Sequence, residues 1–205
     1  MARVGGAQLR SVGVVDKFMA NLHAGAGKMT DSNLSRYQAP TAVDLPRSDI
    51  SAIAETVRRK VEYLPGVSLE DVIKRLGGEV CYSESEETPS YLVVEPEGFA
   101  ICLPRGTSRA RDRFTIAQML GHYVLHYLYQ RQRNRRTIQF LRVSLPVPEQ
   151  AEKEANWFAA AFLMPAAIFK EKFKDFEKND LALAEHFGVS SQAVQLRADS
   201  LNLRT

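Results

Sequence analysis

The chain is short of cysteine, of net charge and of long apolar runs, and each shortage argues against a class of protein. The two cysteines, Cys81 and Cys102, lie in expected strands, and nothing in the sequence indicates an extracellular location that would support a disulfide. A net charge of +3 is too small to indicate a nucleic-acid-binding protein. No apolar run approaches the roughly 18 residues of a membrane helix, and the N-terminus lacks the apolar block of a signal peptide. We therefore expect a cytoplasmic protein with two free thiols and no membrane contact.

The rest of the composition is that of an ordinary globular protein. Charged residues make up 25% and hydrophobic residues 45% of the 205 residues, enough for one domain with a buried core. Residues 1–46 contain Gly and Pro and show little periodicity, so we expect a flexible leader with a short helix at residues 12–22. A partner-binding arm is the alternative. Residues 47–178 are expected to form the core, and residues 179–205 a helical segment packed on it.

The apolar pattern of the core predicts a mixture of helices and short strands. Ser68-Leu-Glu-Asp71 is a capping arrangement that predicts the start of a short helix ending at Gly77-Gly78. Periodicity and residue type predict other helices at 49–63, 113–129 and 149–163, and strands at 79–83, 91–94, 99–103 and 137–143. The pattern predicts an α+β fold in which a small mixed sheet packs against helices.

The most informative stretch is the pentad Gln118-Met119-Leu120-Gly121-His122, on the expected helix 113–129. The zinc-protease motif His-Glu-x-x-His places two imidazoles four residues apart as metal ligands, and its Glu acts on the bound water. His122 matches the second ligand, whereas Gln118 stands at the position of the first ligand and Met119 at that of the general base. A neutral amide is a poor zinc ligand, and a thioether cannot take a proton from water. The pentad therefore predicts a site that has lost its metal chemistry.

Motifs on both sides of the pentad resemble the ImmA/IrrE family of metallopeptidases. Arg113-Phe-Thr-Ile-Ala precedes it, Tyr123-Val-Leu-His126 follows it, and Glu154-Ala-Asn-Trp-Phe-Ala-Ala-Ala-Phe-Leu-Met-Pro165 lies downstream. The last segment, Leu183 to Arg197, also resembles the family. The resemblance implies a zincin-like minimal peptidase core and a third zinc ligand at Glu154. It also implies an association with helix-turn-helix repressors of mobile elements and stress responses.

The resemblance leaves several arrangements of the site open. Glu152 is a nearby alternative to Glu154, but two residues on a helix lie about 200° apart, so we expect its side chain to point elsewhere. His122 and Glu154 are expected to form a polar pocket or a direct hydrogen bond, with weak metal binding as the alternative. His126 could replace the missing ligand in a shifted register, although family members often carry a His there, which favours a structural role. No cofactor is expected, and zinc is expected only if the site functions.

A basic run lies between the two motif helices, near the rim of the expected cleft. Its arginines are Arg131, Arg133, Arg135 and Arg136. Such a run can contact phosphates or an acidic protein partner. A solvated loop is the simpler interpretation.

The C-terminal run 181–197 has the pattern of a helix-turn-helix: a helix, a Gly turn, a Ser cap and a second helix. Its second helix offers Gln192, Gln195 and Arg197 as contacts to DNA. Peptidases of the resembled family share this element, so a packing role is favoured over DNA binding.

Three functions follow from these observations. The favoured one is a catalytically inactive ImmA/IrrE-like protein that binds a protein partner, such as a helix-turn-helix regulator, since an exposed groove can outlast its chemistry. The second is an active zinc peptidase with an atypical ligand set that cleaves such a regulator. The third is a DNA-binding regulator.

Overall fold

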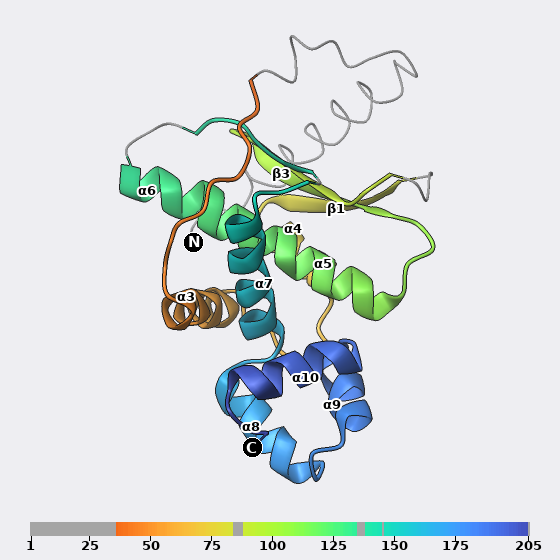
Figure 1. The fold of residues 1–205 in the computed structure, drawn as a ribbon. Coiled ribbons are helices and arrows are strands. Elements are labelled where there is room, and N and C mark those ends of the chain that lie inside the picture. The colour runs from red at the N-terminus through yellow and green to blue at the C-terminus, as the bar shows by residue number, and fades with distance from the viewer. Residues whose placement is uncertain (1–35, 84–87, 135–137, 145, 205) are drawn as a thin grey trace, which may run out of the picture.

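Helices pack against a mixed four-stranded sheet in the computed structural model, which describes residues 36–83, 88–134, 138–144 and 146–204 (Figure 1). The sheet has the order β1-β3-β2-β4, with β1 parallel to β3 and the other pairs antiparallel. This confirms the predicted α+β fold. The strands are β1 Gly78–Ser83, β2 Tyr91–Glu95, β3 Gly98–Pro104 and β4 Leu141–Ser144.

The helices form near the predicted positions and begin at side-chain caps where the sequence offers them. The hydroxyl of Ser68 accepts from the amide of Asp71, as the capping pattern predicts. Ser108, Asn179 and Ser190 cap later helices in the same way. The helices are α3 Arg47–Lys60, α4 Leu69–Arg75, α5 Arg109–Gly121, α6 Gln130–Asn134, α7 Glu149–Leu163, α8 Ala166–Asp175, α9 Asp180–Phe187 and α10 Ser191–Ser200.

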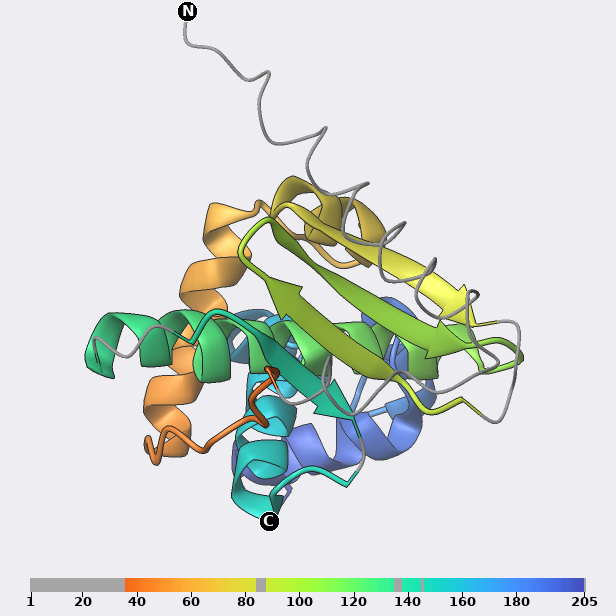
Figure 2. The same cartoon turned by 90° about the horizontal axis from the view of Figure 1, so that it is seen from above.

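Between α5 and α6 the chain continues as a π-helix, η1, over His122–Tyr129. Together the three segments form one long helix under the sheet (Figure 2). A π-helix is rare and is found disproportionately at functional sites. The sequence predicts a helix here but gives no signal for the wider turn, which includes His122 and His126.

Helix α7 crosses the long helix at Gly121, inside the pentad. A Cβ atom at Gly121 would lie 3.1 Å from both the carbonyl oxygen of Ala155 and the Cβ atom of Phe158. Glycine thus suits the close approach of α5 to α7, where a methyl group would have to displace its neighbours by a few tenths of an ångström.

The substitution Gly121→Ala is expected to lower the free energy of unfolding by about 1–3 kcal/mol, because the methyl group overpacks the crossing. Urea denaturation would measure this loss. Thr56→Ala, on the exposed face of α3, is the control and should change stability by less than about 0.5 kcal/mol. A stabilising effect of Gly121→Ala would show that the two helices separate at little cost.

Residues 36–46 lie against the core, so the expectation of a flexible leader does not hold for them. Gln38 pairs with the edge strand β4: its amide donates to the carbonyl of Phe140, and its carbonyl accepts from the amide of Arg142, both at 3.0 Å. Val43 is buried. The predicted helix at 12–22 lies outside the described residues.

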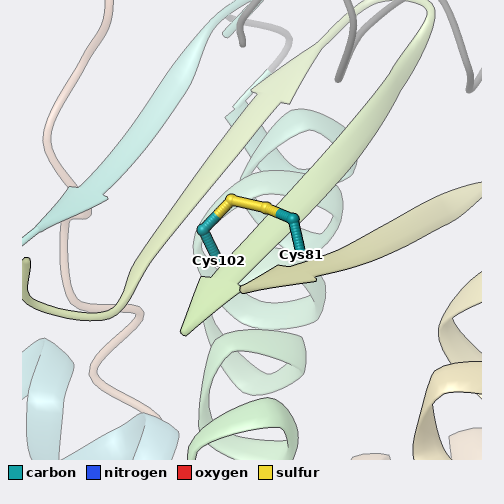
Figure 3. Close-up of a disulfide and its surroundings, with 2 residues drawn as sticks. All are labelled: Cys81 and Cys102. Carbon is teal, nitrogen blue, oxygen red and sulfur yellow. A yellow bond between two sulfur atoms is a disulfide. The ribbon is translucent and has the colours of Figure 1, made fainter. Parts of the chain in front are cut away.

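Cys81 and Cys102 form a disulfide, so the prediction of two free thiols is wrong (Figure 3). The parallel pairing of β1 with β3 places the two residues side by side, with their Cα atoms 4.6 Å apart. The two cysteines are 21 residues apart along the chain, and the sequence alone does not indicate that they are neighbours in the sheet. Disulfides are rare in reducing compartments, so the cysteines give no support to the expected cytoplasmic location. Within the described part of the chain, no helix is long and apolar enough to cross a membrane.

The C-terminal segment consists of α9, a turn at Gly188 and α10. Gly188 adopts a left-handed conformation with φ of 64°, and a Cβ atom there would lie 2.7 Å from the Nε atom of Arg113. Phe187, Val194 and Ala198 are buried in the main hydrophobic core. The segment thus packs on the core, and its identity as a helix-turn-helix remains a prediction.

Candidate functional site

The pentad side chains meet α7 where the two motif helices cross. The side-chain amide of Gln118 donates to the Oε1 atom of Glu152 at 2.6 Å and to the Oδ1 atom of Asn156 at 3.0 Å. Gln118 and His122 lie one turn apart on one helix, and Glu152 and Asn156 lie one turn apart on the other. The amide of Gln118 therefore joins α5 to α7 at the place where the resemblance implies a metal.

Glu152 faces the pentad, which corrects the expectation that its side chain points elsewhere. Its Oε2 atom lies 3.7 Å from the Nε2 atom of His122. The two carboxylates do diverge, as helix geometry predicts, but Glu152 is the one directed at Gln118. The nearby imidazole of His122 and the amide of Gln118 lower the pKa of Glu152, so its carboxylate is ionised. Sequence reasoning also missed Asn156, although the four-residue spacing from Glu152 was a usable signal.

Glu154 is buried and anchors a different part of the chain. It accepts hydrogen bonds from the backbone amides of Val43 at 2.9 Å and Asp44 at 2.8 Å, and from the Nε2 atom of His126 at 3.0 Å. Burial alone would raise the pKa of Glu154, but these three hydrogen bonds together lower it. Glu154 therefore fastens residues 43 and 44 to α7. The expected direct contact with His122 is replaced by one relayed through His126.

The two histidines form a hydrogen-bonded pair beside Glu154. Their Nδ1 atoms lie 2.9 Å apart, so one must donate and the other accept. Because Glu154 is ionised, His126 donates to it from Nε2. Burial lowers the pKa of His122, which favours its neutral form. The Nε2 atom of His122 is buried and has no hydrogen-bond partner in the described part of the chain.

The residues do not fit a catalytic zinc ion, which needs three protein ligands and an open position. The unpartnered Nε2 atom of His122 and the carboxylate of Glu152 could supply two. Gln118 directs its amide nitrogen toward the site, and that nitrogen has no lone pair to offer. Among the described residues, no group of three or more His, Cys, Asp or Glu side chains could hold a metal ion.

The two histidines are not placed for the shifted metal site either. Two nitrogens bound to one tetrahedral zinc at 2.0–2.1 Å lie roughly 3.3 Å apart, whereas the Nδ1 atoms of His122 and His126 are at hydrogen-bonding distance, 2.9 Å. The other ring nitrogen of His126 is bound to Glu154. Both ring nitrogens of His126 are thus hydrogen-bonded within the protein, which supports the structural role that was favoured for it.

Gln118, Met119 and Glu152 line a hollow of about 290 Å³ beside the edge strand β4. Thr115 and Val143 form part of its wall. Met119 is 6% exposed and stands where a general base would be needed. The hollow thus lies where the resemblance places the peptidase cleft, but no general base occupies residue 119.

Arg131, the first arginine of the basic run, does not line this hollow. Arg131 donates to the hydroxyl of Tyr127 at 2.6 Å and lies over its ring, 5.1 Å from the centroid. It lines a different hollow, with Glu95 and Tyr123. Arg133 is exposed on α6, and Arg135 and Arg136 lie outside the described residues. The structure does not bring Arg131 to the rim at Gln118.

Two of the three expected DNA contacts on α10 are already engaged. Arg197 is 3% exposed, and its Nε atom donates to the carbonyl of Met164 at 2.9 Å. Gln195 donates to Asp180 at 2.9 Å. Gln192 is exposed. This arrangement disfavours α10 as a recognition helix.

Comparisons with known proteins agree with this fold. The family model described as the IrrE N-terminal-like domain, Peptidase_M78, matches residues 73–199, more than half of the chain. A solved structure of a Mycobacterium tuberculosis transcriptional regulator shares the fold, with a TM-score of 0.52 and 19% identity over 71% of this chain. The match covers 45% of that regulator, so this chain spans less than half of its length. No curated protein sequence matches. The chain belongs to the IrrE N-terminal-like family, Peptidase_M78.

Proposed function

We propose that this chain is a member of the family without peptidase activity, and that it acts by binding a protein. The observation that carries the proposal is the amide of Gln118, which joins Glu152 and Asn156. In a metallopeptidase a metal would connect these helices and activate water. Here a pair of hydrogen bonds makes the connection.

The size of the catalytic loss supports the proposal. Losing a general base, as at Met119, typically costs about 10²–10⁴ in rate. Losing a metal removes in addition the Lewis acid that lowers the pKa of bound water from 15.7 to about 7. Glu152, the carboxylate that faces the pentad, is already engaged by Gln118. The residues around His122 therefore lack both parts of the chemistry.

The partner we propose is a helix-turn-helix transcriptional regulator, which is the class that the resembled peptidases act on. The hollow beside β4 offers an apolar wall, from Met119 and Val143, and the polar groups Gln118, Glu152 and Thr115. Such a mixture suits a protein segment, whose backbone needs hydrogen bonds and whose side chains need apolar contact. DNA binding is less well supported, because Arg197 and Gln195 are engaged within the protein.

Metal content is the first test of the proposal. Protein purified without a metal-affinity tag is expected to hold less than about 0.1 zinc per chain by elemental analysis, since only two of the three required ligands are present. Peptide hydrolysis should not rise above background when zinc is added. The Glu152→Ala variant is the control and should give the same values. About one zinc per chain, lost in that variant, would establish a rebuilt metal site and reject the proposal.

Partner binding is tested at the hollow itself. Purified helix-turn-helix regulators of the source genome would be assayed for complex formation by calorimetry, with and without chelator. Binding is expected to be indifferent to chelator and to be lost in Thr115→Trp, which fills the hollow. Thr56→Trp, on exposed α3, is the matched control. A complex that survives Thr115→Trp would place the partner elsewhere.

A further inference from the structure

A second and larger hollow, of about 550 Å³, lies between α10 and the other side of the α5–α7 crossing. Phe114 and Trp157 supply its aromatic surface, and Arg47, Lys153 and Arg197 bring three positive charges to it. We call these five residues the cationic hollow. None of the five belongs to the site around Gln118, although Asn156, which accepts from Gln118, also lines this hollow. The inference below does not rest on the proposed function.

Arg197 is the strongest sign that the cationic hollow receives a ligand. Its side chain is buried, and its second terminal nitrogen has no hydrogen-bond partner in the described part of the chain. Burial, with the nearby charge of Arg47, lowers the pKa of Arg197 to about 10, while Glu55 acts in the opposite direction. A buried guanidinium donor without an acceptor is costly, so an anion that reached it would be stabilised.

The start of α10 adds to the attraction for an anion. Ser190, Gln192 and Ala193, from the cap and first turn of this 10-residue helix, line the same hollow. The amides of a first helical turn carry partial positive charge. Lys153 faces the hollow while also pairing with exposed Glu149. Arg47 has no ion pair among the described residues, and its guanidinium lies 5.8 Å from the ring centroid of Trp157.

We propose that the cationic hollow binds a small phosphate ester attached to a flat ring, of the nucleotide class. The phosphate would meet Arg197 and the start of α10, where the buried positive charge is concentrated. The ring would lie against Trp157 and Phe114, since aromatic side chains stack on flat rings. A duplex nucleic acid fits less well, because Arg197 is only 3% exposed and lines a hollow rather than a protruding surface.

Trp157 is the single tryptophan of the chain, so its fluorescence reports directly on the cationic hollow. Adenosine monophosphate, adenosine and inorganic phosphate would each be titrated into the full chain. The nucleotide is expected to change the emission with a Kd below about 1 mM, and the two fragments to bind at least roughly tenfold more weakly. Calorimetry would confirm each Kd without relying on fluorescence.

Variants then locate the phosphate. Arg47→Gln and Lys153→Gln are each expected to weaken nucleotide binding by about tenfold, because each removes a charge from the hollow. Arg59→Gln, at the exposed far end of α3, is the matched control and should bind as the unaltered chain does. Arg197→Lys keeps the charge but loses the fork and the buried hydrogen bond to Met164, so it is expected to weaken nucleotide binding and also to lower the melting temperature.

Three results would overturn the proposal. One is the absence of both an emission change and heat at about 5 mM nucleotide, well above the expected Kd. Another is inorganic phosphate binding as tightly as the nucleotide, which would leave the aromatic surface without a role. The last is a short DNA duplex that binds more tightly than the nucleotide and loses its binding in Arg47→Gln, which would make the hollow part of a nucleic-acid surface.

Discussion

Replacing Gln118 by His and Met119 by Glu is expected to give a chain that holds about one zinc ion, whereas the unaltered chain is expected to hold almost none. The reason is the arrangement around Gln118. Its side chain contacts Glu152, and the Nε2 atom of His122 is buried, unpartnered among the described residues and 3.7 Å from the same carboxylate. An imidazole at residue 118 would supply the third ligand that the site lacks.

The relay from Glu154 strengthens this expectation. Metal-binding histidines usually donate their other ring N–H to a neighbouring group, which fixes the ring and its tautomer. The Nδ1 atom of His122 is already hydrogen-bonded to His126, which donates in turn to Glu154. The part of the site behind His122 is thus arranged as a metal site requires, although the ligand at residue 118 is missing.

Elemental analysis and zinc titration by calorimetry would measure the gain. Gln118→His alone should bind zinc, and Met119→Glu alone should not, because only the first supplies a ligand. Peptide hydrolysis is expected in the double variant alone, with the introduced carboxylate at residue 119 acting as the base. A double variant that folds and stays free of zinc would show that α5 and α7 pack too closely at residue 118 to admit a metal ion.

The sequence predicted those parts of the fold that depend on local pattern. The capped start of α4 at Ser68 and the strands β1, β2 and β3 are set by neighbouring residues, and they appear within one or two positions of the prediction. The parallel pairing of β1 with β3 depends on residues far apart in sequence. No local pattern contains it, and the disulfide of Cys81 with Cys102 was missed for that reason.

The candidate site divides in the same way. The departure from the zinc-protease motif at Gln118 and Met119 is visible in the sequence, because the motif defines which residue type belongs at each position. Which carboxylate faces the pentad depends on how α7 crosses α5, and helix periodicity separates Glu152 from Glu154 without saying which is turned inward. The role of Glu154 could not be read at all, because two of its partners are backbone amides of residues 43 and 44, which any sequence would supply.

Glu154→Ala is expected to lower the free energy of unfolding by about 3–5 kcal/mol, because it leaves His126 and the amides of Val43 and Asp44 buried without an acceptor. A domain of this size has a free energy of unfolding of only about 5–15 kcal/mol, so this loss is a large part of the total. Glu154→Gln keeps one acceptor oxygen and is the milder variant. Its stability should lie between those of Glu154→Ala and the unaltered chain. Urea denaturation gives both values. Glu149→Ala, on the same helix with a side chain 83% exposed, should change stability by less than about 0.5 kcal/mol.

The same two carboxylates can be tested against each other in the double variant Gln118→His, Met119→Glu. There Glu152→Ala is expected to abolish zinc binding with little change in the stability of the metal-free chain, because Glu152 is partly exposed. Glu154→Ala is expected to reduce the stability of the metal-free chain, while any chain that remains folded still binds zinc through His122 and Glu152. If zinc binding were lost in Glu154→Ala and stability in Glu152→Ala, the roles proposed for the two carboxylates would have to be reversed. Helix α7 therefore carries two carboxylates with separate contacts, two residues apart: Glu152 faces Gln118 and His122, and Glu154 fastens residues 43 and 44 to the core.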